Sequence, residues 1–281
     1  MRTWLASLAL VGCSTVPNPL YCDEDLDCNN GERCNLDVNG CEAVVPVDAL
    51  HDAPDDGPEM DGPYIAKTVR EVRAATTPVD TFVELTGVVV TAVDKYGPRT
   101  GDFWVQDAGG GPMSGVHIYS AIASEVAQLV PGDIVDIGNA RKVLFTIGGD
   151  TSGRSEIELM PRVGGNIVLT KTGATTPVST DIDVAAIATL AQPELDEELE
   201  NWAGMLVRAT FVDADGEPML MTGITQFPLG PFFVQDTQVQ LPSGIVAGTC
   251  FVELVGIVEY ARNYNLVPRQ ASDMTISGTC P

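Results

Sequence analysis

Two histidines occur among the 281 residues, and they limit the chemistry that the chain could perform. His51 lies in a stretch of proline and aspartate, so a nucleophile activated by histidine could use only His117. His117 alternates with Val116 and Ile118, a pattern that predicts a strand side chain facing solvent rather than a catalytic base. The metalloprotease, serine-hydrolase and phosphate-loop patterns are all missing. The sequence therefore predicts a protein without catalytic residues, cofactor or metal site.

Aspartate and arginine recur at matching places in the two halves of the chain. Asp107 and Asp236 each end an aromatic phrase, and Arg162 and Arg269 each follow a proline. A carboxylate at a strand end is favoured as a turn cap that accepts hydrogen bonds from amides, with a metal or acid role as the alternative. Cations are scarce here, so each arginine is expected to anchor a carboxylate of its own domain, as Arg162–Asp107 and Arg269–Asp236.

Several aromatic side chains are candidates for binding a ligand through their ring faces. On an alternating strand one of two neighbouring aromatic residues points inward, so Trp104 and Phe233 are expected on an exposed face. Such rings could act as stacking platforms on a β-barrel, with core packing as the alternative. The full set of candidates is Trp104, Tyr119, Phe233, Tyr260 and Tyr264.

The seven cysteines fall into groups of one, four and two, and the even groups predict disulfides and an oxidising compartment. The group of four lies in a stretch with almost no apolar residues, which must be held together by bridges of undetermined connectivity. Its spacing is too wide for a zinc site, and it lacks the order of a calcium loop. The four are Cys22, Cys28, Cys34 and Cys41. Cys250 and Cys280 are expected to form the remaining disulfide.

The N-terminus has the pattern of a targeting segment, with Met1-Arg2 followed by a short apolar run from Trp4 to Val11. The sequence Leu10-Val11-Gly12-Cys13 resembles the lipobox of bacterial lipoproteins. That resemblance implies a signal peptide cleaved before Cys13, acylation of the cysteine with fatty acids such as palmitate, and anchoring without a transmembrane helix. Ser14 then favours the outer membrane. An ordinary secretory signal is the alternative.

The net charge of −24 excludes several classes of partner. A chain this acidic is a poor electrostatic match for nucleic-acid phosphates or anionic lipid. Neither a run of basic residues nor a combined aromatic and arginine surface occurs in the sequence. We therefore do not expect nucleic acid as a partner, and expect the membrane to be met only through the lipid.

One phrase occurs twice and organises the large C-terminal part of the chain. Phe103-Trp104-Val105-Gln106-Asp107 returns as Phe232-Phe233-Val234-Gln235-Asp236. In both copies a glycine-led apolar strand follows, and then a tail in which proline and arginine end a short apolar run. Three blocks in the same order predict a domain duplication.

The expected elements of the first copy are strands at 82–91, 103–107 and 115–119, a short helix at 122–129, and strands at 132–137 and 156–160. Three strands, a helix and two strands is the order of an OB-fold barrel. Residues 65–74 could be helix or strand. In the second copy we expect a helix at 181–190 and strands at 205–212, 232–236, near 238–241, at 251–258 and at 265–268, without a helix after the third.

Residues 64–170 resemble the OB-fold modules found beside secreted bacterial nucleases and in surface lipoproteins. The resemblance lies in the strand from Val83 to Thr91, the Phe103–Asp107 phrase and Pro131-Gly132-Asp133. The cysteine-rich segment also resembles modules that follow the lipobox in bacterial surface lipoproteins. The sequence thus predicts a signal peptide (1–12), a lipidated cysteine-rich module (13–43), an acidic linker (44–63) and two OB-like domains (64–172 and 173–281).

The fold class predicted from these patterns is mainly all-β, with two tandem OB-like five-stranded barrels. The function expected is that of a non-enzymatic, lipid-anchored protein of the cell envelope that binds a partner protein or a carbohydrate. Binding of single-stranded nucleic acid, as the nuclease-associated modules suggest, and a purely structural spacer are the alternatives.

Overall fold

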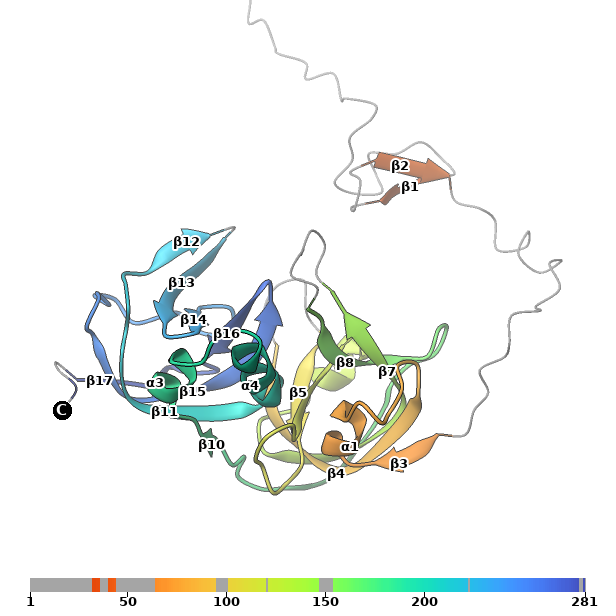
Figure 1. The fold of residues 1–281 in the computed structure, drawn as a ribbon. Helices are drawn as coiled ribbons and strands as arrows, with labels where there is room; N and C mark the ends of the chain where they lie inside the picture. The colour runs from red at the N-terminus through yellow and green to blue at the C-terminus, as the bar shows by residue number, and fades with distance from the viewer. Residues whose placement is uncertain are drawn as a thin grey trace, which may run out of the picture. The chain divides into compact units, whose positions relative to one another are not determined.

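The computed structural model describes two compact units, Met1–Asp61 and Gly62–Pro281, each of which is considered by itself (Figure 1). The residues described are 32–35, 40–43, 64–94, 101–119, 121–146, 154–221, 223–277 and 280. In the first unit, β1 (Glu32–Asn35) and β2 (Gly40–Ala43) form an antiparallel hairpin that places Cys34 opposite Cys41 in the backbone register. Cys13, Cys22, Cys28, the predicted signal peptide and the predicted linker lie outside the described residues.

The second unit begins with a domain whose sheet closes on itself. Strand pairing runs from β4 through β5, β6, β8 and β7 and back to β4, which makes a five-stranded barrel with OB topology. Its elements are β3 (Ile65–Lys67), α1 (Val69–Arg73), β4 (Phe82–Val93), β5 (Phe103–Gln106), β6 (Gly115–Ile118), α2 (Ala123–Val126), β7 (Asp133–Phe145), β8 (Glu156–Pro161) and β9 (Val168–Ala174).

The strand order predicted for this domain is confirmed, with three differences in extent. The undecided stretch at residues 65–74 contains both a strand and a helix, β3 and α1. Strand β7 continues to Phe145, well beyond the predicted end. Strand β9 was not predicted; it pairs with β7 and carries the domain past residue 172 to Ala174. A bulge in β4 lies at Gly87, whose φ of 68° suits glycine.

The next domain has the same strand order without full closure. The pairing order β11-β15-β16-β14-β13 corresponds, strand by strand, to the order β4-β7-β8-β6-β5 in the first barrel. The difference is that, where the structure describes the chain, the first and second strands pair in the first domain only. Among the described residues β11 and β13 are not paired, although the amide of Asp215 bonds the carbonyl of Pro228 at 3.0 Å. The elements are β10 (Thr180–Asp181), α3 (Val184–Ala188), α4 (Glu194–Trp202), β11 (Leu206–Asp213), β12 (Met219–Met221), β13 (Ile224–Leu229), β14 (Phe232–Gln235), β15 (Cys250–Ala261), β16 (Asn263–Val267), the 3-10 turn η4 (Ala271–Asp273) and β17 (Met274–Ser277).

The repeated phrase occupies different strands in the two domains, which corrects the predicted alignment. In the first domain the phrase forms β5, the second strand of the barrel. In the second domain it forms β14, which pairs in parallel with β16 as β6 does with β8. It is therefore the third strand, and β13 takes the place of β5. The strand predicted near 238–241 is absent from those residues, which the structure describes as turn and coil.

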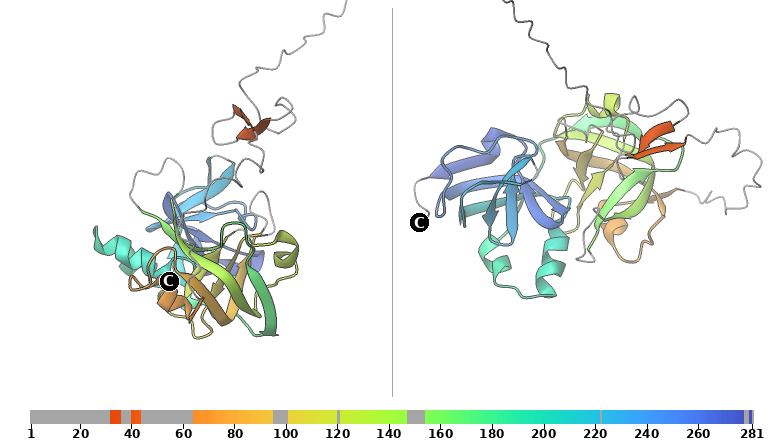
Figure 2. Two further views of the ribbon diagram at one scale, coloured as in Figure 1. Left: turned by 90° about the vertical axis from the view of Figure 1, so that its right-hand side faces the viewer. Right: turned by 90° about the horizontal axis from the view of Figure 1, so that it is seen from above.

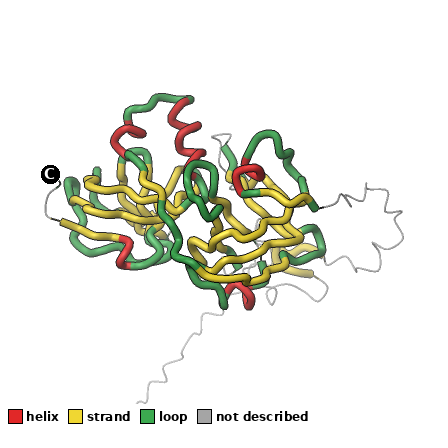
Figure 3. The backbone as a smooth tube through the Cα atoms, turned by 90° about the horizontal axis from the view of Figure 1, so that it is seen from below, coloured by secondary structure: helices red, strands yellow, loops and turns green. Residues whose placement is uncertain are grey.

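The domain duplication itself is supported by the topology rather than by the phrase. Short strands β3 and β10 each pair in parallel with the first strand of their domain. Strands β9 and β17 each pair antiparallel with the fourth. Figure 3 shows that the helices lie outside the strands of the two sheets. In the right-hand view of Figure 2, helices α3 and α4 project together from the strands of the second domain. As expected, no helix lies between the third and fourth strands of the second domain, β14 and β15, in the described residues.

The two domains of this unit share a buried apolar junction. Each has its own core, and a third cluster joins Ala92 and Trp104 of the first domain to Leu206, Val255 and Ile257 of the second. Apolar area removed from water in this way stabilises the packing of one domain on the other. The outer face of the first barrel is therefore covered where the second domain lies on it.

An arginine from α1 crosses this junction. Arg73 is 4% exposed, and its guanidinium donates hydrogen bonds to the carbonyls of Gly115 (3.0 Å) and Ala203. It also bonds the carboxylate of Glu200 on α4 at 2.7 Å. Burial lowers the pKa of Arg73 and raises that of Glu200, while the attraction between the two opposes both shifts.

The backbones of the two domains also approach closely beside Arg73. A Cβ atom on Gly115 would lie 2.3 Å from the carbonyl oxygen of Gly204, which leaves no room for any other residue. The amide of Met113 donates to the carbonyl of Asn201 at 2.7 Å in the same region. Arg73 therefore satisfies carbonyls that this close approach removes from water.

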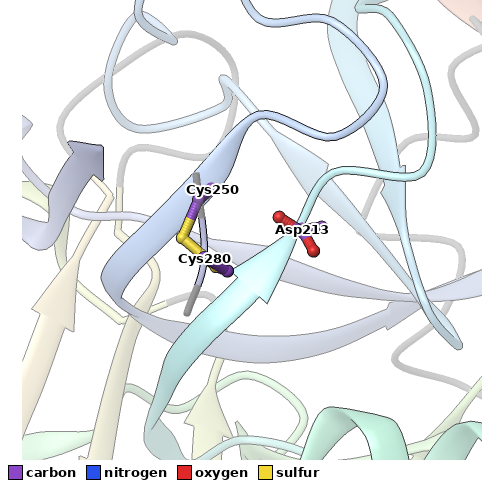
Figure 4. A group of neighbouring side chains, drawn as sticks. All are labelled: Asp213, Cys250 and Cys280. Carbon is purple, nitrogen blue, oxygen red and sulfur yellow. A yellow bond between two sulfur atoms is a disulfide. The ribbon is translucent and has the colours of Figure 1, made fainter. Parts of the chain in front are cut away.

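The C-terminal disulfide predicted from the sequence is confirmed. Cys250 at the start of β15 is bonded to Cys280, and Asp213 lies beside them (Figure 4). Since the two sulfurs are bonded to each other, neither is available as a thiolate ligand, and this group is not a metal site. Among the described residues, no helix is both long enough and apolar enough to cross a membrane.

Replacing Arg73 by methionine is expected to lower the free energy of unfolding by about 3–5 kcal/mol, because the Glu200 carboxylate and the carbonyls of Gly115, Ala203 and Glu200 lose a buried donor. Chemical denaturation followed by circular dichroism measures the loss. Arg208→Met is the matched control, since Arg208 pairs with Asp181 at an exposed position and its loss should change little. Equal stabilities for the two variants would contradict a structural role for Arg73.

Candidate ligand cavity at the junction of the two domains

A row of side chains crosses the outer face of the first barrel where the second domain covers it. Trp104 on β5 lies opposite His117 on β6, and His117 lies opposite Glu158 on β8. Their neighbours along the strands, such as Phe103 and Ile118, point into the barrel core. The alternation of the strands thus directs an aromatic ring, an imidazole and a carboxylate toward the junction.

A cavity of about 270 Å³ opens beside this row. Strands β6, β7 and β8 of the first domain and the end of β15 of the second contribute to its walls. The side chains that line it are His117, Tyr119, Phe145, Glu156, Glu158, Glu259, Tyr260 and Ala261. Because both domains supply walls, the cavity depends on how they are packed together.

His117 is held on three sides at the inner end of the cavity. Its ring stacks on Trp104 with centroids 4.6 Å apart and planes 8° from parallel. Its Nδ1 lies 3.1 Å from Glu158 Oε1 and 3.9 Å from Glu156 Oε1. Its Nε2 lies 3.6 Å from Asp102 Oδ2. The orientation of both ring nitrogens is therefore fixed by surrounding groups.

The electrostatics of this cluster favour a positive charge on the imidazole. Burial alone would lower the pKa of His117, but the carboxylates of Asp102, Glu158 and Glu156 outweigh it and raise that pKa to about 10. At neutral pH the imidazolium then offsets one of the surrounding negative charges. The remaining carboxylates keep the inner end of the cavity negative.

The outer side of the cavity is aromatic. The rings of Tyr119 and Phe145 are stacked, with centroids 6.3 Å apart and planes 19° from parallel, and Phe145 is 39% exposed. Tyr119 also meets the edge of the His117 ring at 6.2 Å. The cavity therefore offers ring faces at its mouth and hydrogen-bond acceptors inside, an arrangement that suits a small polar ligand with an apolar face.

The structure brings together two of the five aromatic candidates, Tyr119 and Tyr260, at this cavity. Trp104 points out of its barrel as expected but is 0% exposed, because the second domain covers that face. Tyr264 is buried and bonds Glu200 at 3.2 Å, so it is not an exposed platform. Phe233 is half-buried and lies on β14, away from the residues that line the cavity.

The expectation that His117 faces solvent is wrong, since the residue is 1% exposed. The alternating pattern correctly predicts that His117 lies on the outer side of the barrel wall. It does not reveal that the second domain covers this side. Glu156, Glu158, Glu259, Asp102 and Phe145 were not identified as site residues. The acidic and apolar alternation of Glu156-Ile157-Glu158 was the available signal, because it puts both carboxylates on one side of a strand.

The recurring aspartates do accept hydrogen bonds from amides, but from distant segments. Asp107 accepts from the amides of Val69 and Arg70 at the start of α1, and Asp236 accepts from Thr225 at 2.8 Å. Both carboxylates therefore accept hydrogen bonds from amides, as expected, but the amides belong to other segments rather than to the turns that follow the two aspartates. Neither aspartate is among the residues that line the cavity.

The predicted pairing of Arg269 with Asp236 differs from the contact in the structure, whereas the pairing of Arg162 with Asp107 stays a prediction. Arg269 pairs with Asp273 at 2.9 Å instead of Asp236, and donates to the carbonyl of Thr91 across the junction. It thus anchors a carboxylate of its own domain, as expected, but a different one. Arg162 lies over the ring of Phe82, 6.0 Å from its centroid.

In protein stripped of bound ions, His117 is expected to remain protonated at pH 8. Its pKa is raised from the unfolded value of 6.5 to about 10, so its stabilisation is fully present below about pH 6.5 and is lost as pH rises through about 10. Ring-nitrogen chemical shifts measured by NMR check this, with His51 as the second histidine in the spectrum. Titration of both histidines near pH 6.5 would contradict the arrangement.

No family of known proteins matches the chain, and no curated protein matches it. Among solved structures, the chain is similar to a putative aspartyl-tRNA synthetase from Leishmania major Friedlin, with 19% identity over 52% of this chain and a TM-score of 0.28; it spans 28% of that protein. It is also similar to the Ifi202 HINa domain in complex with 20 bp double-stranded DNA (11% identity, 70% of this chain, 96% of that chain, TM-score 0.33). A third similar structure is a murine DNA-binding protein bound to double-stranded DNA, with 9% identity over 68% of this chain and 95% of that chain and a TM-score of 0.30. Similarities this weak carry no conclusion about function, and the OB-like assignment rests on the strand order described above.

Proposed function

We propose that this chain is a non-enzymatic binding protein of the cell envelope, and that the junction cavity binds one saccharide unit. The observation that carries the proposal is the pairing of an aromatic mouth, Tyr119 and Phe145, with an interior lined by carboxylates. The cavity of about 270 Å³ is small for a drug-sized molecule, and its size suits a single sugar ring.

The chemistry of a sugar matches both parts of the cavity. The apolar face of a sugar ring stacks on aromatic side chains, for which Tyr119 and Phe145 present stacked rings. Sugar hydroxyl groups donate hydrogen bonds, and carboxylate oxygens such as those of Glu259 accept them. Such charge-assisted bonds are stronger than bonds between neutral groups, and they fix the orientation of the bound ring.

The competing functions are less well supported by the cavity. A catalytic role through the repeated aspartates would need Asp107 and Asp236 beside His117, and both cap distant amides instead. A cavity lined by Glu156, Glu158 and Glu259 repels the phosphates of nucleic acid, in keeping with the charge of −24. A purely structural spacer has no need of a cavity shared by two domains.

The proposal includes attachment to the envelope through lipid on Cys13. The support for it is the sequence Leu10-Val11-Gly12-Cys13 and the disulfide pattern, which suits an oxidising compartment. The disulfide between Cys250 and Cys280 agrees with such a compartment. An acidic stretch between the cysteine-rich segment and the barrels would keep the binding domains away from the lipid surface.

A glycan array probed with the full-length chain is expected to give hits whose affinity changes little between two salt concentrations. Tyr119→Ala should weaken the best hit about tenfold or more, because a stacking surface is lost. Tyr64→Ala is the matched control, since Tyr64 is also half-buried but packs on Phe82 outside the cavity.

A single-stranded DNA oligonucleotide is included in the same screen. Binding of this oligonucleotide that falls steeply with salt would contradict the saccharide proposal and favour nucleic acid. A glycan hit that is equally weakened by Tyr64→Ala and Tyr119→Ala would contradict binding at the cavity.

Replacement of Cys13 by serine is expected to move the protein from the detergent phase to the aqueous phase in a Triton X-114 partition, because no thiol remains for acylation. Ser14→Ala is the control and should stay in the detergent phase. Partition of the Cys13→Ser variant into detergent would contradict the lipid anchor.

A further inference from the structure

We propose that His117, Glu156 and Glu158 bind a divalent transition-metal ion, of the class of Zn²⁺ and Mn²⁺, at the inner end of the junction cavity. The three residues come from β6 and β8, two paired strands of a closed barrel, so their backbone positions are rigid. The proposal uses the same cavity as the saccharide but does not depend on saccharide binding.

The distances between the potential ligand atoms are close to those of a metal site. Nδ1 of His117, a carboxylate oxygen of Glu156 and one of Glu158 all lie within 4.8 Å of one another. His117 Nδ1 lies 3.1 Å from Glu158 Oε1, a separation that two ligands at about 2.0–2.2 Å from one ion can adopt without movement. Glu156 Oε1 lies 3.9 Å from the same nitrogen, so a shift of less than an ångström completes the set.

The surroundings of His117 resemble those of histidines that bind metals. Such a histidine directs one ring nitrogen to the ion and the other to a carboxylate or carbonyl, which fixes the tautomer and the ring. Here Nδ1 faces the two glutamates. Nε2 makes no hydrogen bond within the described residues and lies 3.6 Å from Asp102 Oδ2, a gap that a small movement of the ring closes. The parallel stack on Trp104 holds the ring plane, so Asp102 and Trp104 act as positioning residues.

A buried oxygen without a hydrogen bond points independently to a missing ligand. Glu158 is 2% exposed, and within the described part of the chain its Oε2 accepts no hydrogen bond, although Oε1 is bonded to His117. A buried carboxylate oxygen without a partner costs free energy that an ion would recover. A divalent ion also neutralises the charge that Glu156, Glu158 and Asp102 concentrate here.

The ligand types select the class of ion. One imidazole nitrogen with two carboxylates is a mixed set that suits Zn²⁺, Mn²⁺ or Fe²⁺ better than Mg²⁺ or Ca²⁺, which prefer oxygen ligands alone. Three protein ligands leave a coordination position open toward the cavity, where water or a ligand hydroxyl can bind. Binding of the ion requires that Nδ1 of His117 carries no proton.

The test is a titration of Zn²⁺ into the full-length chain after treatment with a chelator and without saccharide. Calorimetry is expected to give one zinc ion for each chain at the cavity, and NMR is expected to show a shift of the His117 ring nitrogens while those of His51 stay unchanged. Mg²⁺ at the same concentration should leave the His117 signals in place.

Variants separate the ligands from the positioning residue. Glu158→Gln and Glu156→Gln should abolish the zinc-induced shift of His117, and Asp102→Asn should weaken zinc affinity roughly 10–100-fold. Glu253→Gln is the matched control, because Glu253 is a partly exposed residue that faces Arg208 at 3.9 Å, and it should bind zinc normally.

Two results would overturn the metal site. His117 signals unaffected by saturating zinc in the wild-type chain would exclude it, whether or not the variants fold. Zinc binding at full affinity in a folded Glu158→Gln variant would also exclude it. Since saccharide binding is measured separately, loss of either proposal leaves the other open to its own test.

Discussion

The packing of the two OB-like domains depends on one buried guanidinium. Arg73 supplies donors to carbonyls of both domains and to Glu200, at a place where the backbones meet through Gly115 and Gly204. A contact this close would leave carbonyl groups without partners if the arginine were absent. Breaking such a buried pair is costly, so Arg73 stabilises this packing of one domain on the other.

The cavity exists because of that arrangement. His117 and Glu158 belong to the outer face of a barrel, a surface that is exposed when an OB-like domain stands alone. The second domain covers this face with apolar side chains around Trp104, and adds Glu259 and Tyr260 from the end of β15. Covering the face removes water from the carboxylates, which strengthens their interaction with any cation that enters.

The strand order of the first domain could be predicted from the sequence, because turn residues and alternation record the local structure. In the second domain the first, fourth and fifth strands could be predicted in the same way. The burial of Trp104 and His117 beneath the second domain could not be predicted. Alternation distinguishes the two sides of a strand, but it does not show whether a side faces solvent or a neighbouring domain. The same limit hid Glu156 and Glu158, whose spacing indicates one side of a strand and nothing about its surroundings. The second copy of the phrase was assigned to the wrong strand because β13, which precedes it, carries Pro228 and was missed.

The one-strand offset of the repeated phrase changes which residues of the two domains correspond. When the strands are matched by topology, Phe233 stands where His117 stands, and Asn265 stands where Glu158 stands. Asn265 accepts a hydrogen bond from Gln235 at 2.9 Å, so this position has become part of a neutral amide network. The acidic cluster therefore belongs to the first domain alone, and the second domain covers it. A sequence alignment that superposes the two copies of the phrase would pair β5 with β14 and would not show this difference between the domains.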